Sequence, residues 1–455
     1  MNYMIVHILL ISLFILPTLF LLKQQQDTAS DAASDSRTIS TIKLSLTFFA
    51  TQFGGGAIIG VSDTAYHNDF YSAASYGCAI ALGFIILALG IGDTLRKLKL
   101  GTMAEIFYVK YNSKILQSFC GVFSIATYGL ILCATSLSAH KVFFYLGIKS
   151  DIIFIILWIF IILYTVQGGL DMVVKTDVIQ AIAIIIVFMI IALAIHYGSL
   201  ANVPTLYDAF VTHNKHFWPS NSSLLDSSEF DKVLLPMLFT IIGQDMGQRC
   251  FASQSKKSLF IATILAAITM LGAIALPLYL GLSAKQLGLP VDYEAVVLLS
   301  LHQIGSPTLV SLMLFAVSMA IISTADSIIC AIHSNLRKDI FDIDQRFKPS
   351  LMAKLFTIFI SSIAIYSSLS QDSVIPLMLL SYKVFISVFF IPIIFALFLP
   401  KRLLSTKVAF ISVVFNLVLS LFSKLPQLLL QPAAALIYCI AIMLAYSLLQ
   451  IKNKL

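Results

Sequence analysis

The sequence predicts an all-α polytopic membrane protein with about 13 transmembrane helices, and composition is the first observation behind this prediction. Of the 455 residues, 59% are hydrophobic and 11% are charged, whereas soluble domains carry about 45–50% apolar and about 25% charged residues. The second observation is a series of hydrophobic spans, most of them long enough, at about 1.5 Å per residue, to cross about 30 Å of hydrocarbon. The third is that two of these spans are interrupted at matching positions of two blocks of similar length.

The hydrophobic spans follow one another through short polar connections. We number the first as segment 0 and the others as segments 1 to 12, and they cover residues 4–22, 41–66, 72–92, 115–146, 152–167, 176–198, 233–249, 259–283, 306–333, 350–368, 374–399, 407–423 and 432–449. Segment 0 could be a signal peptide, but it lacks a basic n-region, and Lys23-Gln24-Gln25-Gln26 follows it rather than a small-residue cleavage site. We therefore expect residues 1–40 to form an extra transmembrane helix and a cytoplasmic linker, and residues 199–232 to form an external loop.

Lys and Arg residues give the orientation of the chain, because cytoplasmic loops retain positive charge. About 22 of the 29 Lys and Arg residues fall in one set of alternate loops, and about 6 fall in the other. This bias predicts a multi-pass protein of the cell inner (plasma) membrane, with its N-terminus outside and its C-terminus in the cytoplasm. The net charge of +7 then reflects topology, so we expect the lipid bilayer, and no nucleic acid, as a partner.

Motifs of enzyme chemistry are not found in the sequence. The six cysteines all fall in or at the ends of spans, which argues against a disulfide framework and against a CxxC metal or redox site. The eight histidines are scattered, and there is no HExxH motif. We therefore expect a protein that is not an enzyme and has no catalytic residues.

Helix-breaking residues interrupt segments 1 and 6. Segment 1 contains Gly54-Gly55-Gly56, and each glycine weakens a helix by about 1 kcal/mol relative to alanine. Segment 6 contains Pro236 and, further on, Gly243. Backbone that opens at membrane depth must face protein or a wet cavity, because lipid cannot satisfy it. The alternative interpretation is that the glycines only allow close helix packing.

The two interrupted segments begin two blocks, residues 41–198 and 233–399, that contain five spans each. An odd number of spans per block places the blocks in opposite orientations, so they are predicted to be inverted repeats. Residues 400–455 add two C-terminal helices. Interrupted helices at matching positions of inverted halves point to the central binding site of a transporter.

Four stretches of the chain resemble the sodium:solute symporter family, which includes sodium/proline, sodium/sugar, sialic acid, choline and pantothenate transporters. They occur in family order, and they are residues 50–60 in segment 1, residues 164–180 around the link between segments 4 and 5, residues 243–252 in segment 6, and residues 320–327 in segment 8. Each stretch alone is weakly specific, whereas the four together are specific. The resemblance implies a leucine-transporter-like fold with a 5+5 inverted repeat and broken helices 1 and 6.

Segment 8 carries hydroxyl groups suited to a sodium ion. Ala320, Ser323 and Thr324 share one helix face, because they are three and four residues apart. A hard cation needs several oxygen ligands, which two hydroxyls and the carbonyls of an unwound neighbouring helix would supply. The resemblance implies that sodium is bound by the carbonyls of Ala50, Phe53 and Ala320 and by the hydroxyls of Ser323 and Thr324. The alternative is that both hydroxyls only bond the preceding turn of their own helix.

Two acidic residues raise the prospect of a second cation. A carboxylate in the middle of a membrane helix costs about 2.5–3.5 kcal/mol or more, so it usually has a partner and a function. The resemblance implies a second cation between Asp177, at the start of segment 5, and hydroxyls of segment 8, which Ser327 fits. Asp326 departs from the family pattern, because a hydroxyl is usual there. The alternative is that Asp177 is only an acidic residue at the cytoplasmic end of segment 5, where the N-terminus of a helix favours a negative charge.

The substrate is expected beside the breaks of segments 1 and 6. The residues that we expect to line its site are Gln52, Gly55, Gly56, Ala57, Asp63, Thr135, Gln244 and Lys383. Lys383 would pair with a substrate carboxylate or with Asp63, unless it extends its ammonium group to the outer interface. Asp63 would meet a substrate amine, unless it caps the outer end of segment 1.

These observations favour a sodium-coupled symporter, with Na+ as the coupling ion, that moves a small polar organic solute into the cell by alternating access. An amino acid or another small organic ion is the favoured substrate, and a monomer is expected to suffice for transport. One alternative is a proton-coupled transporter of the same fold that uses Asp326 or Asp177. The other is a solute sensor, although such receptors usually carry a soluble signalling domain, and the sequence leaves no room for one at its C-terminal end.

Overall fold

The computed structural model describes residues 39–67, 70–145, 151–197, 227–290, 296–304, 307–341, 351–371 and 373–421. Within these ranges the chain is almost entirely helical, and the only β contact is an isolated bridge between Ile39 and Ser253. The expected all-α fold is therefore confirmed. Segments 0 and 12 and most of the expected external loop lie outside the described residues.

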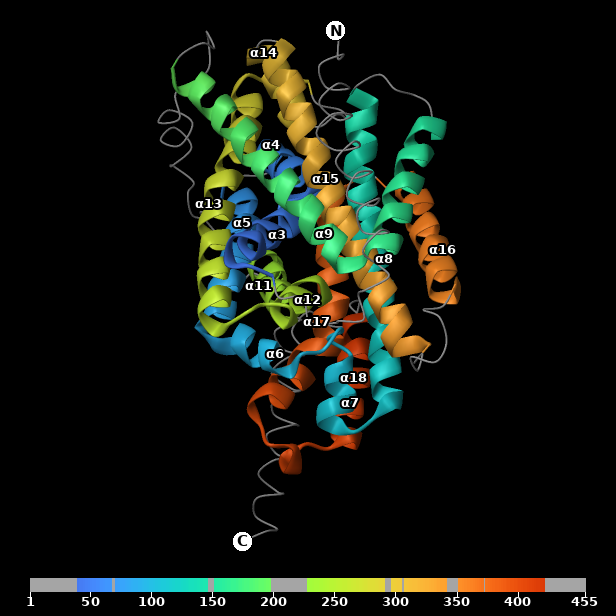
Figure 1. The fold of residues 1–455 in the computed structure, drawn as a ribbon. Helices are drawn as coiled ribbons and strands as arrows, with labels where there is room; N and C mark the ends of the chain where they lie inside the picture. Colours follow the sequence, from blue (N-terminus) through green and yellow to red (C-terminus); the bar gives the residue numbers. More distant parts are fainter. Residues whose placement is uncertain are drawn as a thin grey trace.

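The described helices reproduce segments 1 to 11 in order (Figure 1). They are α3 (Thr41–Gln52), η2 (Gly56–Gly60) and α4 (Val61–His67) for segment 1; α5 (Phe70–Ile86), η3 (Leu87–Ile91) and α6 (Gly92–Leu98) for segment 2; α8 (Lys114–Tyr145) for segment 3; α9 (Asp151–His196) for segments 4 and 5; α11 (Ser227–Ile242) and α12 (Gln244–Phe251) for segment 6; α13 (Lys256–Gln286), α15 (Pro307–Asn335), α16 (Leu351–Ser368), α17 (Val374–Phe398) and α18 (Thr406–Leu421) for segments 7 to 11. Short helices α7 (Glu105–Tyr111), α14 (Val296–Ile304), η5 (Leu336–Ile340) and η6 (Lys401–Leu403) lie between or after them.

Seven helices in the described ranges are long and apolar enough to cross a membrane, or up to eight if a bent pair counts as one span. The predicted number of 13 crossings is therefore not confirmed. One reason is that segments 4 and 5 are joined as α9, which is interrupted only at Gly169 by a positive φ of 57°. Another is that the two halves of segment 6 are each short.

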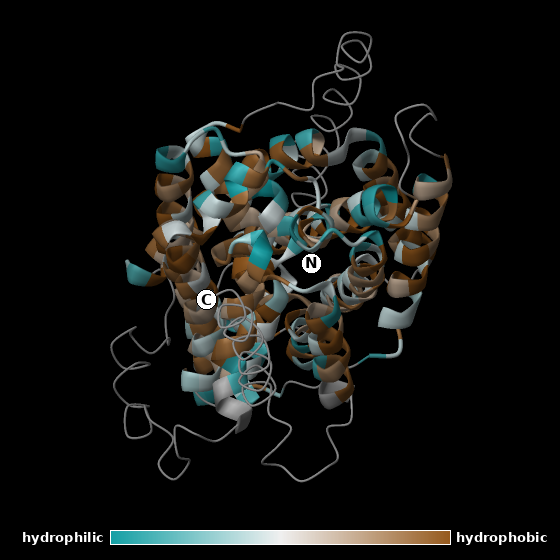
Figure 2. Ribbon diagram, turned by 90° about the horizontal axis from the view of Figure 1, so that it is seen from below, coloured by the Kyte–Doolittle hydropathy of each residue, from teal (hydrophilic) through white to brown (hydrophobic). Residues whose placement is uncertain are grey.

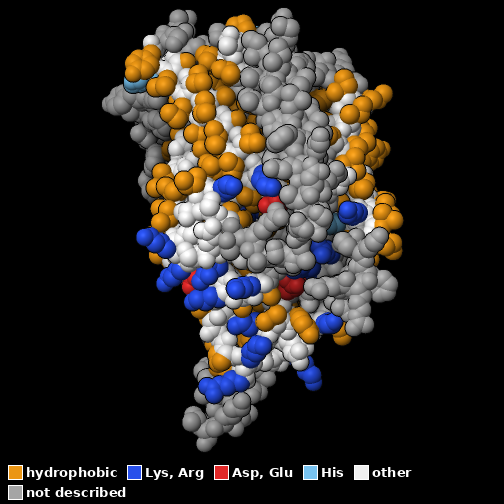
Figure 3. Space-filling view, viewed as in Figure 1, with side chains coloured by type: hydrophobic (Ala, Val, Ile, Leu, Met, Phe, Trp, Pro, Cys, Tyr) orange, Lys and Arg blue, Asp and Glu red, His pale blue; other side chains and the backbone are white. Residues whose placement is uncertain are grey.

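The outer surface of the helical bundle is suited to lipid. Leu89, Ile115, Ile156 and Phe359 are 61–80% exposed, and Figure 2 shows many hydrophobic residues around the rim when the bundle is viewed along its helices. Exposure of such side chains to water costs about 25 cal/mol per Å². Figure 3 shows that Lys and Arg side chains gather toward the end of the molecule that carries α6 and α7, below a face covered by hydrophobic side chains.

Helix α15 lies at the centre of the structure and packs against α8 and α9, while α3 packs against α9, α13 and α15. The chain of segment 1 bends by 58° between its two helical halves. The bend follows Phe53, whose φ of −93° and ψ of 64° are not helical. Segment 6 breaks at Gly243, whose ψ of 143° is extended. Both predicted helix breaks are therefore confirmed.

The glycines of segment 1 also allow close packing. A Cβ atom on Gly54 would lie 2.1 Å from Thr324 Oγ1, and one on Gly55 would lie 2.3 Å from Ser138 Oγ. Real Cβ atoms essentially never approach other atoms so closely. The two interpretations offered for these glycines therefore both hold, because the helix is broken at the place where Thr324 of α15 and Ser138 of α8 pack closely against it.

Candidate functional site

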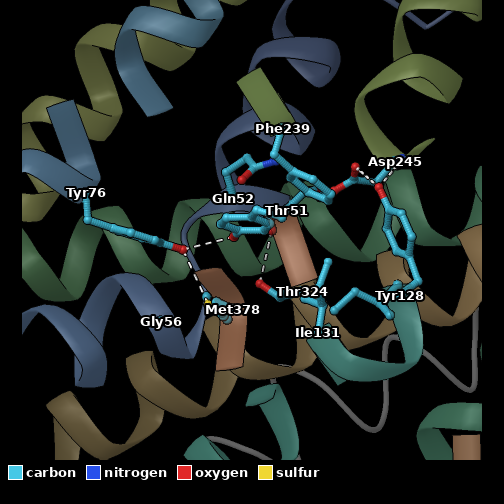
Figure 4. A pocket seen from close by; sticks show the side chains of 13 residues that line it. Thr51, Gln52, Gly56, Tyr76, Tyr128, Ile131, Phe239, Asp245, Thr324 and Met378 are labelled. Carbon is cyan, nitrogen blue, oxygen red and sulfur yellow. Dashed lines mark hydrogen bonds between the residues drawn. The ribbon is translucent and has the colours of Figure 1, made fainter. Parts of the chain in front are cut away.

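A cavity lies beside the breaks of segments 1 and 6, as expected for a central binding site (Figure 4). It contains about 340 Å³ of empty space, including the part that opens to solvent. Its lining comes from α3 and the bend that follows, from α5, α8, α11 and α12, and from α15 and α17. The lining residues are Thr51, Gln52, Gly54, Gly56, Tyr76, Tyr128, Ile131, Phe239, Asp245, Thr324, Ile328, Met378 and Tyr382.

Aromatic rings from four different helices form much of the cavity wall. The rings of Phe239 and Tyr382 are stacked with centroids 4.3 Å apart, and Tyr128 lies 5.8 Å from Phe239. The hydroxyl oxygens of Tyr76 and Tyr382 are 3.1 Å apart. The sequence prediction did not include these rings, because an aromatic residue in a hydrophobic span gives no signal that it faces a cavity.

Asp245 is the one acidic residue among those that line the cavity. Tyr128 donates its hydroxyl to Asp245 Oδ1 at 2.6 Å, and the backbone N–H of Met246 donates to the same oxygen at 2.9 Å. The side chain lies in the first turn of α12, where the helix dipole favours a negative charge. Within the described ranges no cationic side chain forms an ion pair with this carboxylate, because the guanidinium of Arg249 contacts the backbone carbonyl of Asp245 instead. The cavity therefore combines aromatic walls with one negative charge.

The proposed sodium ligands meet between the break of segment 1 and α15. Ser323 Oγ lies 2.9 Å from the carbonyl oxygen of Ala50 and 2.9 Å from that of Ala320. Thr324 Oγ1 lies 3.1 Å from the carbonyl oxygen of Thr51. The hydroxyl of Thr324 thus crosses to segment 1, and that of Ser323 bonds both its own turn and segment 1. Three of the five expected ligand residues are thus joined by hydrogen bonds. Thr324 bonds Thr51, which was not among the expected ligands, and Phe53 follows in the bend.

Arg249 joins the residues predicted to hold a second cation. Its Nη2 atom donates to Asp177 Oδ2 at 2.8 Å and to Ser327 Oγ at 2.7 Å. Its Nε atom donates to Thr47 Oγ1 at 2.8 Å, and Thr47 donates its hydroxyl to the same carboxylate oxygen of Asp177. Both partners of the ion pair are fully buried. Arg249 was missed by the sequence prediction, although a cation inside a membrane span signals by itself that a buried partner is needed.

Asp326 has partners of its own. Its Oδ2 atom accepts hydrogen bonds from Tyr164 at 2.7 Å and from Thr176 at 3.2 Å. Its Oδ1 atom is buried and has no hydrogen-bond partner among the described residues, and the same is true of Asp177 Oδ1. In the described part of the chain, no group of three or more His, Cys, Asp or Glu residues could hold a metal ion.

The expected substrate residues are only partly brought together. Gln52 and Gly56 line the cavity, whereas Gly55 and Ala57 occupy the same bend without lining it. The other two uncharged residues are bonded elsewhere. Thr135 donates its hydroxyl to the carbonyl of its own helix at residue 131, and the side chain of Gln244 bonds the backbone at residues 101 and 103.

Asp63 and Lys383 do not pair with each other. Asp63 forms an ion pair of 2.8 Å with Lys141 of α8, and it also accepts the backbone N–H of Val296 at 3.2 Å. Lys383 lies half-buried on α17. Burial raises the pKa of Asp231 of α11 to about 6, and the positive charge of Lys383 opposes this increase. The interpretation that paired Asp63 with Lys383 is therefore corrected, because α8 supplies a cation nearer to Asp63.

Three transporters of known name are similar to this chain in sequence. High-affinity choline transporter 1 of Torpedo marmorata is 25% identical over 339 residues, which are 69% of this chain and 56% of that protein. The Drosophila melanogaster protein of the same name is 26% identical over 362 residues, 74% of this chain and 56% of its own length. Solute carrier family 5 member 4 of Rattus norvegicus is 23% identical over 173 residues, 36% of this chain and 25% of that protein. The chain thus spans about half the length of the two choline transporters that it matches.

A solved structure and a family description complete the comparison. The substrate-bound outward-open state of a Na+-coupled sialic acid symporter superposes with a TM-score of 0.76 over 98% of both chains, at 17% sequence identity. This likeness shows that the chain has the same fold as that symporter. The description of the sodium:solute symporter family matches residues 34–415. These proteins are transporters, so the expectation that the chain is not an enzyme is confirmed. The chain is a multi-pass membrane protein and belongs to the sodium:solute symporter family.

Proposed function

We propose that the protein is a sodium-coupled symporter that moves a small organic solute into the cell by alternating access. The observation that carries this proposal is the convergence of Ser323, Ala50 and Ala320 oxygens at the break of segment 1. Oxygens 2.9 Å apart are close enough to touch one small cation at the same time. Sodium is a co-transported substrate in this proposal, held by the carbonyls of Ala50, Phe53 and Ala320 and the hydroxyls of Ser323 and Thr324.

The direction of transport follows from the proposed orientation. The concentration of Lys and Arg at one end of the bundle supports a cytoplasmic location for that end (Figure 3). The protein would then lie in the plasma (inner) membrane, with the N-terminus outside and the C-terminus in the cytoplasm. An inside-negative potential supplies about 2.3 kcal/mol per charge for each 100 mV, which favours sodium entry. We expect a monomer to suffice, because both the cavity and the oxygen cluster are built within one chain.

The residues that line the cavity favour a solute with a positively charged group. Among small organic ions, the expected substrate is therefore an organic cation. Aromatic faces attract cations by about 0.5–2 kcal/mol, and quaternary ammonium groups are recognised by aromatic cages. Tyr128, Phe239 and Tyr382 supply such faces, and Asp245 supplies the compensating charge. The similarity to high-affinity choline transporters supports the same class. An amino acid would also need a partner for its carboxylate, and no Lys or Arg side chain is among those lining the cavity.

Coupling to sodium can be tested with the purified protein in proteoliposomes. Uptake of radiolabelled choline, as the first probe, should require external sodium and should rise with an inside-negative potential. External sodium should be replaced by potassium at constant pH and osmolarity. Equal uptake in the two buffers would reject sodium coupling and favour the proton-coupled alternative, which an imposed pH gradient would then reveal.

The solute class can be tested separately by thermal stabilisation at saturating sodium. A ligand that binds the folded state stabilises it by RT ln(1 + [L]/Kd). Choline and other small quaternary ammonium compounds should raise the unfolding temperature, while proline, glucose and sialic acid should not. Phe239→Leu should lower the affinity obtained from this stabilisation about tenfold, in line with a cation–π contribution of about 1–2 kcal/mol. Phe410→Leu on α18 is a matched control, because Phe410 lies on the exposed surface away from the cavity. A shift with proline alone would reject the organic-cation class.

A further inference from the structure

The start of α12 brings Asp245 and Tyr128 into a closed arrangement of hydrogen bonds (Figure 4). The Tyr128 hydroxyl donates to Asp245 Oδ1 at 2.6 Å and accepts the backbone N–H of Asp245 at 3.1 Å. Asp245 Oδ1 also accepts the backbone N–H of Met246 at 2.9 Å. The first N–H groups of a helix have no acceptor within that helix. The two side chains therefore satisfy two of these groups and fix each other at the same time.

Gly243 leaves room for this arrangement. It precedes α12, and its extended ψ of 143° breaks segment 6. A Cβ atom at this position would lie 2.7 Å from Asp245 Oδ1 and 3.2 Å from the Tyr128 hydroxyl. Real Cβ atoms essentially never lie within 3.0 Å of another atom, so a side chain here would force the carboxylate to move.

The carboxylate of Asp245 is held by one oxygen and offers the other. Both hydrogen bonds that it accepts in the described part of the chain end on Oδ1, which leaves Oδ2 for a ligand. The guanidinium of Arg249 does not use it, because it contacts the Asp245 carbonyl and forms its ion pair with Asp177. A cationic group in the cavity would therefore meet a free carboxylate oxygen beside aromatic walls. A group fixed before binding also loses less freedom when the ligand arrives.

We propose that Tyr128 is a positioning residue for the solute: its hydroxyl holds the Asp245 carboxylate so that Oδ2 receives the positively charged group of an organic cation. The pair then makes the cavity select a charged solute over a neutral one of the same shape. A neutral group also packs against the aromatic walls, whereas only a cation gains from a carboxylate in a buried site of low dielectric constant. This inference rests on the proposed function, because it concerns how the same cavity recognises its solute.

The experiment compares choline with its neutral isostere, in which a carbon atom replaces the ammonium nitrogen. Thermal stabilisation of the purified protein at saturating sodium gives both affinities. Tyr128→Phe keeps the ring and removes only the hydroxyl, so it should lower the choline affinity by about tenfold, which is about 1.4 kcal/mol, and leave the affinity for the isostere unchanged. Asp245→Asn should remove most of the preference for choline. Tyr111→Phe is the matched control, because this buried tyrosine lies outside the cavity lining and donates its hydroxyl to the carbonyl of Pro392 at 2.7 Å.

A double variant shows whether Tyr128 acts through Asp245. Tyr128→Phe/Asp245→Asn should bind choline within about twofold of Asp245→Asn alone, because the hydroxyl has no charge left to position. Asp245→Glu keeps the charge and moves the carboxylate away from the hydroxyl, so it should also lower the choline affinity by about tenfold. This variant decides the question if Tyr128→Phe does not fold.

The possible results separate this inference from the proposed function. Equal losses for choline and its isostere in Tyr128→Phe would overturn the inference, because they would show a role in packing alone. Additive losses in the double variant, or wild-type choline affinity in Asp245→Glu, would overturn it as well. In each of these cases sodium coupling and the organic-cation class stay in place. A wild-type protein that binds no choline would reject both this inference and that class.

Discussion

Removal of the hydroxyls of Ser323 and Thr324 tests the proposed sodium site most directly. They are the only side-chain ligands among the five proposed, because the others are backbone carbonyls that no substitution removes. We predict that Ser323→Ala combined with Thr324→Val lowers the apparent sodium affinity by about tenfold or more, which corresponds to about 1.4 kcal/mol. The affinity for the solute at saturating sodium should change much less.

The magnitude follows from the contacts of the two side chains. The double substitution deletes two of five proposed oxygen ligands while keeping the side-chain volume nearly constant, so it creates no large cavity. It also removes the hydrogen bonds from Ser323 to Ala50 and from Thr324 to Thr51, which are 2.9 and 3.1 Å long. Each bond contributes about 1 kcal/mol to stability, so we expect the folded state to lose about 2 kcal/mol and to remain folded.

The assay is a sodium titration, read both as solute uptake and as thermal stability. The matched control is Ser381→Ala combined with Thr240→Val, which deletes the same atoms from two buried residues. Both control hydroxyls bond a carbonyl of their own helix four residues earlier and do not touch the break of segment 1. A sodium dependence that is normal in the test variant, or equally weakened in the control, would refute the assignment of the sodium site while leaving the fold intact.

Three further substitutions test other parts of the structure. Gly54→Ala should lower sodium affinity by more than tenfold, because the new Cβ atom would meet Thr324 Oγ1 at 2.1 Å; a normal sodium titration would contradict the close approach. Asp326→Asn should change sodium affinity by less than threefold, because the amide oxygen still accepts from the two hydroxyl donors of this carboxylate, and a tenfold loss would make Asp326 a sodium ligand. Lys141→Met should lower the free energy of unfolding by about 2–3 kcal/mol, because it leaves Asp63 without its ion-pair partner. Denaturant unfolding measures this loss, and the double variant Lys141→Met/Asp63→Asn should regain most of the lost free energy of unfolding. An unchanged free energy of unfolding in Lys141→Met would show that the ion pair contributes nothing to stability.

The segments and their breaks could be predicted because they depend on local sequence. Hydrophobic length marks a membrane helix without any knowledge of its neighbours. Three consecutive glycines and Gly243 weaken helices wherever they occur, and the structure bends at both places. The hydroxyls of Ser323 and Thr324 lie on one face by helix geometry alone, so their meeting with segment 1 needed only the resemblance to place that segment.

The partners of the charged residues could not be predicted, because they depend on which helices pack together. Asp63 finds Lys141 from α8 rather than Lys383 from α17, although either is far away in the sequence. Arg249 is one turn from Asp245, yet its guanidinium turns to Asp177 on another helix. A sequence shows that a buried charge requires a partner, whereas the tertiary structure selects that partner.

The proposed coupling between ion and solute would have its physical basis in the backbone at the break of segment 1. The carbonyls of Ala50 and Thr51 contact the hydroxyls of α15, and the next residues, Gln52 and Gly54, line the cavity for the solute. A sodium ion that fixes these carbonyls would therefore also fix one wall of the cavity, and the solute would meet a wall that is already ordered. By linkage, a solute that orders the same wall must raise the affinity for sodium by the same factor. Thr324 belongs to both places, since it lines the cavity and bonds the carbonyl of Thr51, so no separate relay between the two sites is required.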